Sequence, residues 1–224
     1  LESPIAPPIV HLARALGLKE IGVSVRDMRR MTTEIREGEY AQEPAKMAPI
    51  GNPIISIESL SLNFADKQVL KQISANVFAH EIVAVMGRNG AGKSSLLKSL
   101  AGIMDGVTGA VLVDSQDPQK LKGAIRRESI GFIPQEPSDL LYGQSVAIEC
   151  EQADSDNGVP KGTTVSVLNQ LVPGISLHAH PRDLSEGQRL GLALSVVLSG
   201  NPKILILDEP TRGLDYQAKN ELTR

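Results

Sequence analysis

The chain has 224 residues, of which 41% are hydrophobic and 22% charged, a composition that suits one globular domain with room for an appendage. The formal net charge of -3 gives no basic excess, so we do not expect nucleic acid as a main partner. No apolar run approaches the ~18 residues that span a bilayer, so any membrane association is expected to be peripheral. The single cysteine, Cys150, excludes a disulfide framework and indicates a reducing compartment.

Residues 1–53 differ from the rest of the chain, and two short helices are expected in them. The apolar residues of the first helix fall on one face before Gly17: Ile9, Leu12, Ala13 and Leu16. Ser24 is expected to cap the second helix, with Asp27 as its acidic third residue and with Met28, Met31 and Ile35 facing inward. Residues 37–53 are polar, with three prolines and two glycines, as is typical of a linker, although a flexible tail is the alternative.

Apolar runs predict a series of strands from residue 54 onward: Ile54–Ile57, Ile73–Phe78, Glu81–Met86, Ala110–Val113 and Ile130–Ile133. Phe64 precedes a predicted turn around Asp66 and Lys67. Residues 138–183 are less regular and are expected to be mostly helix or loop, with a polar surface loop over residues 154–163.

Residues 87–94 read Gly-Arg-Asn-Gly-Ala-Gly-Lys-Ser, which is the phosphate-binding pattern G-x-x-x-x-G-K-S. The motif follows a predicted strand and precedes the helical pattern of Ser95–Ala101, so its context is the required one. Glycines let the backbone turn and aim its N–H groups at phosphate, and the helix N-terminus adds positive charge. Lys93 can reach the β- and γ-phosphates, and the Ser94 hydroxyl can bind Mg²⁺.

A strong helix is predicted from Leu184-Ser185-Glu186-Gly187-Gln188 through Leu198, with Ser185 and Gln188 spaced as in a capping box. The buried strand Ile204–Leu207 then runs directly into Asp208 and Glu209. Two carboxylates at a strand end need hydrogen bonds or a cation. Beside a phosphate loop, Asp208 would hold Mg²⁺ and Glu209 would deprotonate a water molecule. The alternative is that both only leave the sheet at a turn closed by Pro210.

From Ile54 to Arg224 the chain resembles an ATP-binding cassette (ABC) ATPase, because several motifs follow in the family's order. The resemblance identifies residues 87–94 as the Walker A loop and Gln135 as the Q-loop glutamine. It identifies Leu184–Gln188 as the signature motif, in which Glu186 departs from the family pattern. Asp208 and Glu209 would end the Walker B motif, and Gly213-Leu214-Asp215 would be the D-loop. It implies catalytic roles for Glu209 and Gln135, and Mg²⁺ contacts from Ser94, Gln135 and Asp208. The implied ATP contacts are Phe64, Gly87, Arg88, Asn89, Gly90, Ala91, Gly92, Lys93, Ser94, Ser95, Ser185, Gly187 and Gln188. Three alternatives stay open: that Phe64 is a core residue, that Gln135 is an ordinary loop amide and that Ser185 is only a helix cap.

The resemblance implies an α/β fold of the P-loop NTPase class, with a RecA-like core sheet, an antiparallel β subdomain and a helical subdomain at about residues 136–200. Residues 1–53 would be a connector, similar to the one between the cassettes of fused energy-coupling-factor ATPases, and residues 54–224 the ABC ATPase domain. The implied function is ATP hydrolysis that drives membrane transport, such as vitamin or metal-ion uptake. Its partners would be a second cassette and a transmembrane subunit, and its location would be the cytoplasmic face of the cell membrane. The alternative is a soluble, non-transport ABC protein of ribosomes or DNA repair.

One departure from the family concerns a histidine that follows the D-loop on a further strand. All four histidines here, His11, His80, His178 and His180, precede Asp208. The chain begins with Leu1 and ends in a helical pattern without a stop signal. We therefore expect a fragment that lacks an interior strand between the Walker A and Walker B strands, and that is marginally stable and inactive by itself. Cys150, His178 and His180 are expected to have no catalytic role.

Overall fold

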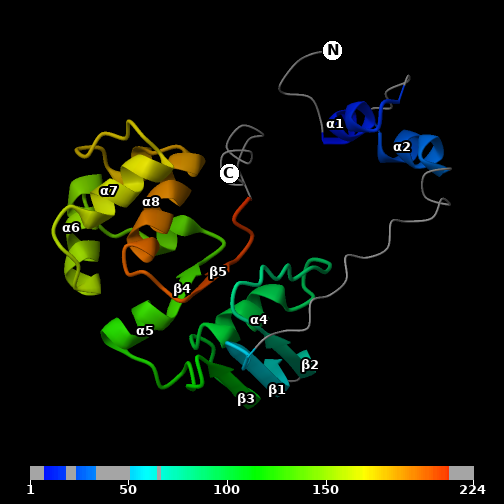
Figure 1. Cartoon of the computed structure of the whole chain (residues 1–224), viewed down its shortest axis with the longest axis horizontal. Coiled ribbons are helices and arrows are strands. Elements are labelled where there is room, and N and C mark those ends of the chain that lie inside the picture. The colour runs from blue at the N-terminus through cyan, green and yellow to red at the C-terminus, as the bar shows by residue number, and fades with distance from the viewer. Residues whose placement is uncertain (1–7, 19–23, 34–50, 65–66, 212–224) are drawn as a thin grey trace. The chain divides into compact units, whose positions relative to one another are not determined.

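The computed structural model describes residues 8–18, 24–33, 51–64 and 67–211 (Figure 1). The chain divides into two compact units, the larger of which spans Ile50–Leu214. The smaller unit contains α1 (Pro8–Ala15) and α2 (Val25–Met31). The elements of the larger unit are, in order, β1 (Ile55–Phe64), β2 (Lys67–Val77), α4 (Lys93–Leu100), β3 (Val107–Val113), α5 (Gly123–Ser129), β4 (Ile130–Ile133), η1 (Pro137–Leu140), α6 (Val146–Asn157), α7 (Thr163–Leu171), η2 (Pro181–Asp183), α8 (Glu186–Leu198) and β5 (Ile204–Leu207). Over the described ranges, no helix combines the length and the apolar character needed to cross a bilayer.

The two helices of the smaller unit lie close to where the sequence predicts them. The Asp27 N–H donates to Ser24 Oγ at 3.2 Å, and Ser24 Oγ donates to the Asp27 carboxylate at 2.6 Å, which confirms the predicted cap. Ala13 is buried, but Leu16, which was predicted to share a face with it, is 39% exposed. The reason is that α1 ends at Ala15 and Leu16 lies in the turn that follows it. Most of the predicted linker, through residue 50, lies outside the described residues, as do the side chain of Met28 and the whole of Ile35.

An antiparallel sheet of order β2-β1-β3 forms the first layer of the larger unit. Ile55 and Ile57 of β1 face the core, and a strict alternation would place Ser59 beside them. Ser59 instead has a φ of 51°, and the register shifts there, so the inward positions pass to Leu60 and Leu62. Gly109 of β3 makes this bulge possible, because a Cβ there would lie 2.6 Å from the carbonyl oxygens of Glu58 and Ser59.

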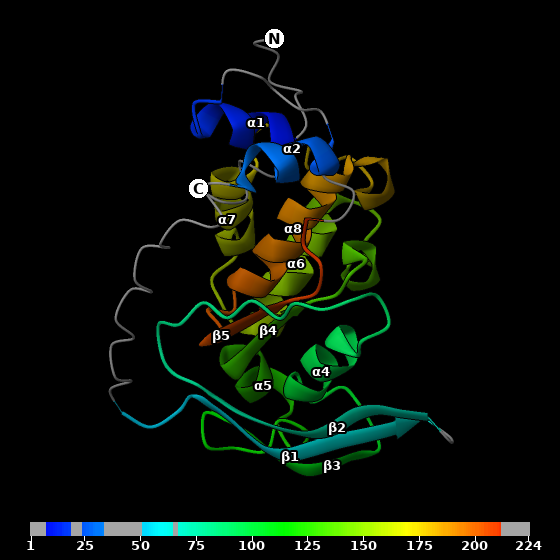
Figure 2. The same cartoon turned by 90° about the vertical axis from the view of Figure 1, so that its right-hand side faces the viewer.

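A second, parallel pair of strands lies between this sheet and the helical layer (Figures 1 and 2). β4 pairs with β5 from Ile130 opposite Ile204 to Ile133 opposite Leu207, with the bounds predicted from the sequence. Three more of the predicted strands are confirmed with shifted bounds: β1 extends to Phe64, β2 runs from Lys67 to Val77 and β3 begins at Val107. Ile130 and Ile206 join the core under the antiparallel sheet, so the two sheets share one hydrophobic cluster.

The helices α6, α7 and α8 form the layer on the other side of β4 and β5, around a second hydrophobic cluster (Figure 2). The predicted surface loop over residues 154–163 is confirmed only for residues 158–162, because α6 continues to Asn157 and α7 begins at Thr163. Asp154 is only 4% exposed, and its carboxylate accepts from the Thr164 hydroxyl at 2.6 Å, the Thr164 N–H at 2.8 Å and the Gly162 N–H at 2.6 Å. The carboxylate thus caps the start of α7. The polar sequence of this segment suggests solvent exposure and does not indicate this capping role.

Burial raises the pKa of Asp154, but the hydrogen bonds from Thr164 and its neighbours more than offset this, so the pKa lies below its ordinary value. A carboxylate whose pKa is lower in the folded state stabilises the fold above the unfolded-state pKa, and this contribution is lost as the pH falls through the folded-state pKa. We expect Asp154→Asn to lower the free energy of unfolding of the full-length protein by about 1.5–3 kcal/mol at pH 7. The difference between variant and wild type is expected to shrink below about pH 4. Denaturant melts over a pH series measure it, and Asp156→Asn, an exposed neighbour on α6, is the control.

Residues 81–86 do not form the strand predicted for them. They run without strand pairing, and their apolar side chains face solvent, with Ile82 fully exposed and Met86 89% exposed. A segment becomes a strand only when a neighbour supplies hydrogen-bond partners, and β5 pairs only with β4 in the described part of the chain. The apolar pattern of residues 81–86 predicts a buried strand, but no neighbouring strand in the described part of the chain pairs with this segment or covers it.

We expect the 224-residue chain expressed by itself to melt without a sharp transition, because unpaired backbone and exposed apolar side chains near residues 82–86 invite association. Net stability of a domain is only about 5–15 kcal/mol, and each buried unsatisfied polar group costs about 1–3 kcal/mol. Calorimetry and phosphate release would compare it with a longer piece of the same gene. Equal melting temperatures and equal turnover would contradict the expectation.

Candidate functional site

The phosphate-binding pattern lies in the loop that leads into α4. Gly92 stands at the N-terminal cap of α4 with a φ of 93°, which strongly favours glycine. A Cβ at Gly92 would also lie 3.0 Å from the Val69 carbonyl oxygen and 3.0 Å from Leu70 Cδ2, so glycine lets the loop pack against β2. Residues 87–91 are exposed, and the N-terminus of α4 adds its partial positive charge beside them. The loop thus combines open backbone with a helix start, as anion binding requires.

Lys93 is folded back over this loop. Its Nζ donates to the Gly87 carbonyl oxygen at 3.1 Å and to the Arg88 carbonyl oxygen at 3.3 Å. Both acceptors are neutral, and phosphate oxygens are stronger acceptors for an ammonium group. The ammonium is therefore held at the mouth of the loop and can exchange these carbonyl contacts for an anion.

The structure brings Ser94 and Asp208 together from opposite parts of the sequence. Ser94 Oγ, on the first turn of α4, donates to Asp208 Oδ1 at 3.1 Å, and Asp208 is 2% exposed at the end of β5. The Asp208 N–H donates to the Ile133 carbonyl oxygen at 3.0 Å, which continues the β4–β5 pairing by one residue. A hydroxyl and a carboxylate oxygen at this separation suit Mg²⁺, which takes few protein ligands beside phosphate and water. In the described residues no larger cluster of metal-binding side chains occurs.

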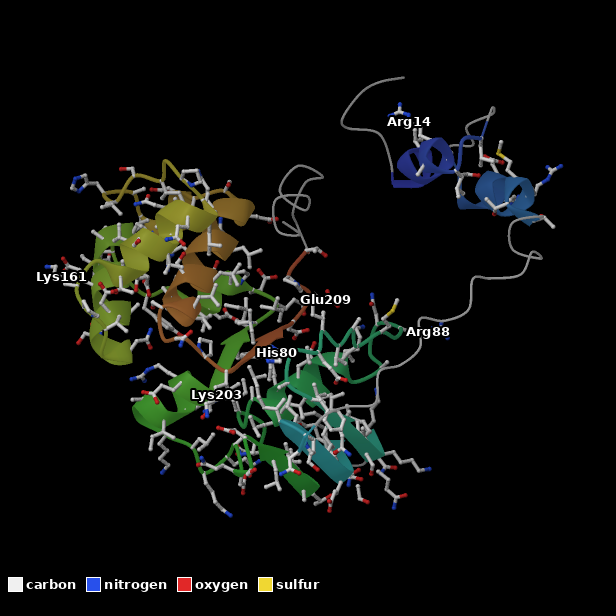
Figure 3. All side chains as sticks on the ribbon, in the orientation of Figure 1. Arg14, His80, Arg88, Lys161, Lys203 and Glu209 are labelled. Carbon is white, nitrogen blue, oxygen red and sulfur yellow. The ribbon has the colours of Figure 1, made fainter. Side chains whose placement is uncertain are left out.

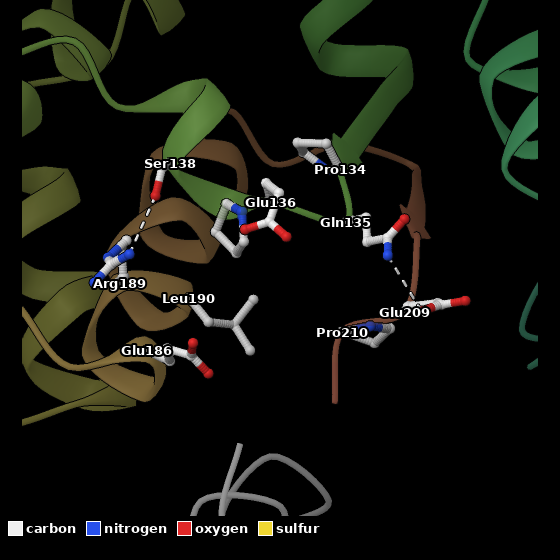
Figure 4. Close-up of a pocket in the computed structure, with 10 residues that line it drawn as sticks. Pro134, Gln135, Glu136, Ser138, Glu186, Arg189, Leu190, Glu209 and Pro210 are labelled. Atoms are coloured by element: carbon white, nitrogen blue, oxygen red, sulfur yellow. Dashed lines mark hydrogen bonds between the residues drawn. The ribbon is translucent and has the colours of Figure 1, made fainter. Parts of the chain in front are cut away.

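Glu209 follows Asp208 beyond the end of β5, whereas Lys203 precedes the start of that strand (Figure 3). The Glu209 φ of 50° is unusual for a residue with a side chain, and such backbone strain is often found at functional sites. Gln135, just beyond the end of β4, places its Nε2 3.5 Å from Glu209 Oε2 (Figure 4). The parallel pairing of β4 with β5 explains this meeting, because it aligns the carboxyl ends of the two strands.

Gln135 and Glu209 line one end of a cavity of about 200 Å³ that reaches to α8 (Figure 4). The other lining residues are Pro134, Glu136, Pro137, Ser138, Glu186, Arg189, Leu190 and Pro210. No residue of the phosphate loop lines this cavity, so it adjoins the Ser94–Asp208 pair without containing it. Sequence reasoning missed Ser138 and Arg189. A signal for Arg189 was available, since it is the single basic residue of α8 and directly follows Gln188.

The signature residues lie at the start of α8. Ser185 Oγ accepts from the Gln188 N–H at 3.3 Å, and the Ser185 N–H donates to the Gln188 side-chain oxygen at 3.0 Å, so the predicted capping box is present. Ser185 and Glu186 are exposed. The structure therefore does not join these residues to the phosphate loop of the same chain, and a nucleotide contact from Ser185 stays a prediction.

The remaining candidates are placed separately. Phe64, at the end of β1, is 50% exposed, which excludes the alternative that it is plain core. Cys150 is buried, and burial together with the charges of Asp154 and Glu149 raises the pKa of its thiol to about 11, so it carries little reactive thiolate. His178 is exposed, and His180 Nδ1 accepts from the Arg182 N–H. The predicted D-loop, residues 213–215, lies outside the described residues.

Comparisons with known proteins agree with this architecture. A family profile described as "ABC transporter" matches residues 70–212. A Streptomyces avermitilis protein named "Putative ABC transporter ATP-binding protein" is 41% identical over 98% of this chain and 44% of its own length. The "Energy-coupling factor transporter ATP-binding protein EcfA3" of Clostridium perfringens is 32% identical over 76% of this chain and 62% of its own length. The chain spans about half the length of several curated relatives that it matches.

Solved structures show the same fold. The structure of cbiO1 from Clostridium perfringens, described as part of the ABC transporter complex cbiONQ, has a TM-score of 0.64 and 32% identity. That match covers 77% of this chain and 71% of the other. The predicted fold class, a P-loop NTPase of the ABC type, is thereby confirmed. With a profile match over most of its length and a relative at 41% identity, this chain belongs to the ABC transporter family of ATP-binding proteins.

Proposed function

We propose that this chain is the ATP-binding and ATP-hydrolysing part of a membrane transporter. One observation carries the proposal: the first turn of α4 and the buried carboxylate of Asp208 meet at 3.1 Å, directly beside Glu209. A phosphate loop beside a buried acidic strand end is the arrangement that nucleoside triphosphate hydrolysis with Mg²⁺ requires. Family membership supports the same reading of these residues.

Binding begins with the loop of residues 87–92 and the start of α4. Lys93 leaves the carbonyl oxygens of Gly87 and Arg88 and pairs with the β- and γ-phosphates, while backbone N–H groups and the α4 N-terminus hold the remaining oxygens. Phe64, which is exposed at the end of β1, offers its ring face to the adenine. These contacts orient the γ-phosphate toward the end of β5.

Hydrolysis is assigned to the carboxyl ends of β4 and β5. Mg²⁺, when bound, would neutralise phosphate charge, and Ser94, Asp208 and Gln135 are the residues that would hold it. Glu209 takes a proton from the attacking water, and its left-handed backbone directs the carboxylate toward Gln135. Gln135 in turn orients both the carboxylate and the water through its amide.

The finer reading of the whole protein rests on the resemblance. Two cassettes sandwich two nucleotides, with Ser185, Gly187 and Gln188 of one cassette contacting the nucleotide of the other. Exposure of Ser185 at the start of α8 is compatible with this role. A transmembrane subunit on the cytoplasmic face of the membrane would convert cassette closure into uptake of a vitamin or a metal ion. The energy-coupling-factor name of a relative supports this subclass.

Substitution Lys93→Ala in the full-length protein tests the phosphate loop. The variant loses charge-assisted contacts worth about 1.5–3 kcal/mol, so we expect ATP·Mg²⁺ to bind about tenfold more weakly or worse. Titration with a fluorescent ATP analogue measures the change. Lys98→Ala, in the same helix but outside the motif, is the control, and equal affinity of Lys93→Ala and wild type would refute the assignment.

Substitution Glu209→Gln in the full-length protein tests the general base. The amide keeps the shape of the side chain but cannot accept a proton from water, so turnover is expected to fall by about 10²–10⁴-fold with ATP binding retained. Phosphate release at saturating ATP measures the turnover. Glu151→Gln removes an exposed carboxylate on α6 and serves as the control. A Glu209→Gln variant with wild-type turnover would show that the base lies elsewhere.

A further inference from the structure

Arg189 of α8 connects two loops that are far apart in the sequence. Its Nη2 donates to the Leu184 carbonyl oxygen at 2.7 Å, and its Nη1 donates to Ser138 Oγ at 3.4 Å (Figure 4). Leu184 directly precedes Ser185, and Ser138 belongs to η1, the turn that follows Gln135. One planar guanidinium therefore contacts both the signature loop and the loop of the strand-end glutamine.

Both loops are stiff enough to pass on a displacement. In η1 the Asp139 N–H donates to the Glu136 carbonyl oxygen at 3.0 Å and the Leu141 N–H to the Ser138 carbonyl oxygen at 3.1 Å. On the other side, Leu184 is buried in the hydrophobic cluster of the helical layer, and Ser185 is held in its capping box. A shift of η1 would therefore move Ser185 through Arg189, because neither segment can deform freely around the contact.

The guanidinium occupies this place at a cost. Its Nε is buried and has no hydrogen-bond partner, a condition that in the described part of the chain is shared by one other side-chain atom, Arg127 Nε. An unsatisfied buried donor destabilises the fold, so an apolar side chain of similar length would suit packing alone at least as well. Arg127 provides an internal comparison, because it joins α5 to α6 through the Asp156 carbonyl oxygen, away from the cavity.

We propose that Arg189 is a positioning residue that ties the Gln135 loop to Ser185, so that both respond together when nucleotide binds. The inference rests on the proposed function, in which Gln135 would hold Mg²⁺ and orient the water in its own cassette, and Ser185 contacts the nucleotide of the other cassette. Arg189 touches neither nucleotide. Its effect is on the geometry of the two loops, and the fork of the guanidinium is needed because two acceptors must be held at once.

The test uses the full-length protein with Arg189→Met, Arg189→Lys and the matched variant Arg127→Met. We expect Arg189→Met to lower kcat about tenfold, with the dissociation constant of ATP unchanged, because one charge-assisted link is lost away from the phosphate loop. Arg189→Lys reaches only one of the two acceptors and is expected to stay impaired. Arg127→Met also removes an arginine whose Nε is buried without a partner, and it is expected to keep the wild-type kcat. Adding Ser138→Ala to Arg189→Met is expected to lower kcat no further, since both substitutions remove the same Arg189–Ser138 hydrogen bond.

Amide hydrogen exchange supplies a measurement that does not depend on turnover. In Arg189→Met, amides of residues 135–141 and of residues 184–188 are expected to exchange faster by about threefold or more, and in Arg127→Met they are not. A change in only one of the two segments, or an equal change in both variants, would overturn the inference. So would a wild-type kcat in Arg189→Met, or a kcat loss that Arg127→Met matches. Failure of the proposed function would appear differently, as absent turnover in the wild type or full turnover in Glu209→Gln.

Discussion

The hydrogen bond between Ser94 and the buried carboxylate of Asp208 is the constraint on which the site depends. It joins the first turn of α4, which packs under the antiparallel sheet, to the end of β5, which belongs to the parallel pair. A carboxylate that is 2% exposed is costly unless it is hydrogen-bonded or binds a cation. The same group that aligns the two layers is thus the one that a phosphate-bound cation would use.

The phosphate loop keeps its place although the segment before it has no strand partner. Gly92 packs against the backbone of β2 on one side, and Ser94 bonds Asp208 on the other. Residues 81–86 lie between β2 and this anchored point, with their apolar side chains exposed. The anchors of the loop are therefore tertiary contacts at its helix end, and they are independent of pairing by the segment that precedes it.

The α8 helix links the site to the rest of the helical layer. Its first turn carries the capping box and Arg189, its middle is buried against the α6–α7 cluster, and its end receives hydrogen bonds from Asn157 of α6. These contacts fix both ends of α8. We therefore expect displacements at the cavity beside Gln135 and at Ser185 to be coupled through α8. The hydrogen bonds of Arg189 are part of this coupling.

Local patterns were enough to predict the elements whose signals lie within a few residues of one another. The phosphate motif, the capping box at Ser185, the cap at Ser24 and the strand Ile204–Leu207 with its two carboxylates were all predicted, because spacing within a few residues decides them. The register of β1 was not predictable in the same way, since the bulge at Ser59 depends on Gly109, which lies on another strand. Asp154 was assigned to a surface loop because its polarity is local, whereas its hydrogen bonds come from Gly162 and Thr164 across a turn. Two further features depend on long-range contacts: residues 81–86 lack strand pairing, and Arg189 joins Ser138 to Leu184. Both cases have the same cause: the residue pattern of a segment does not indicate whether a distant segment will supply its hydrogen-bond partners.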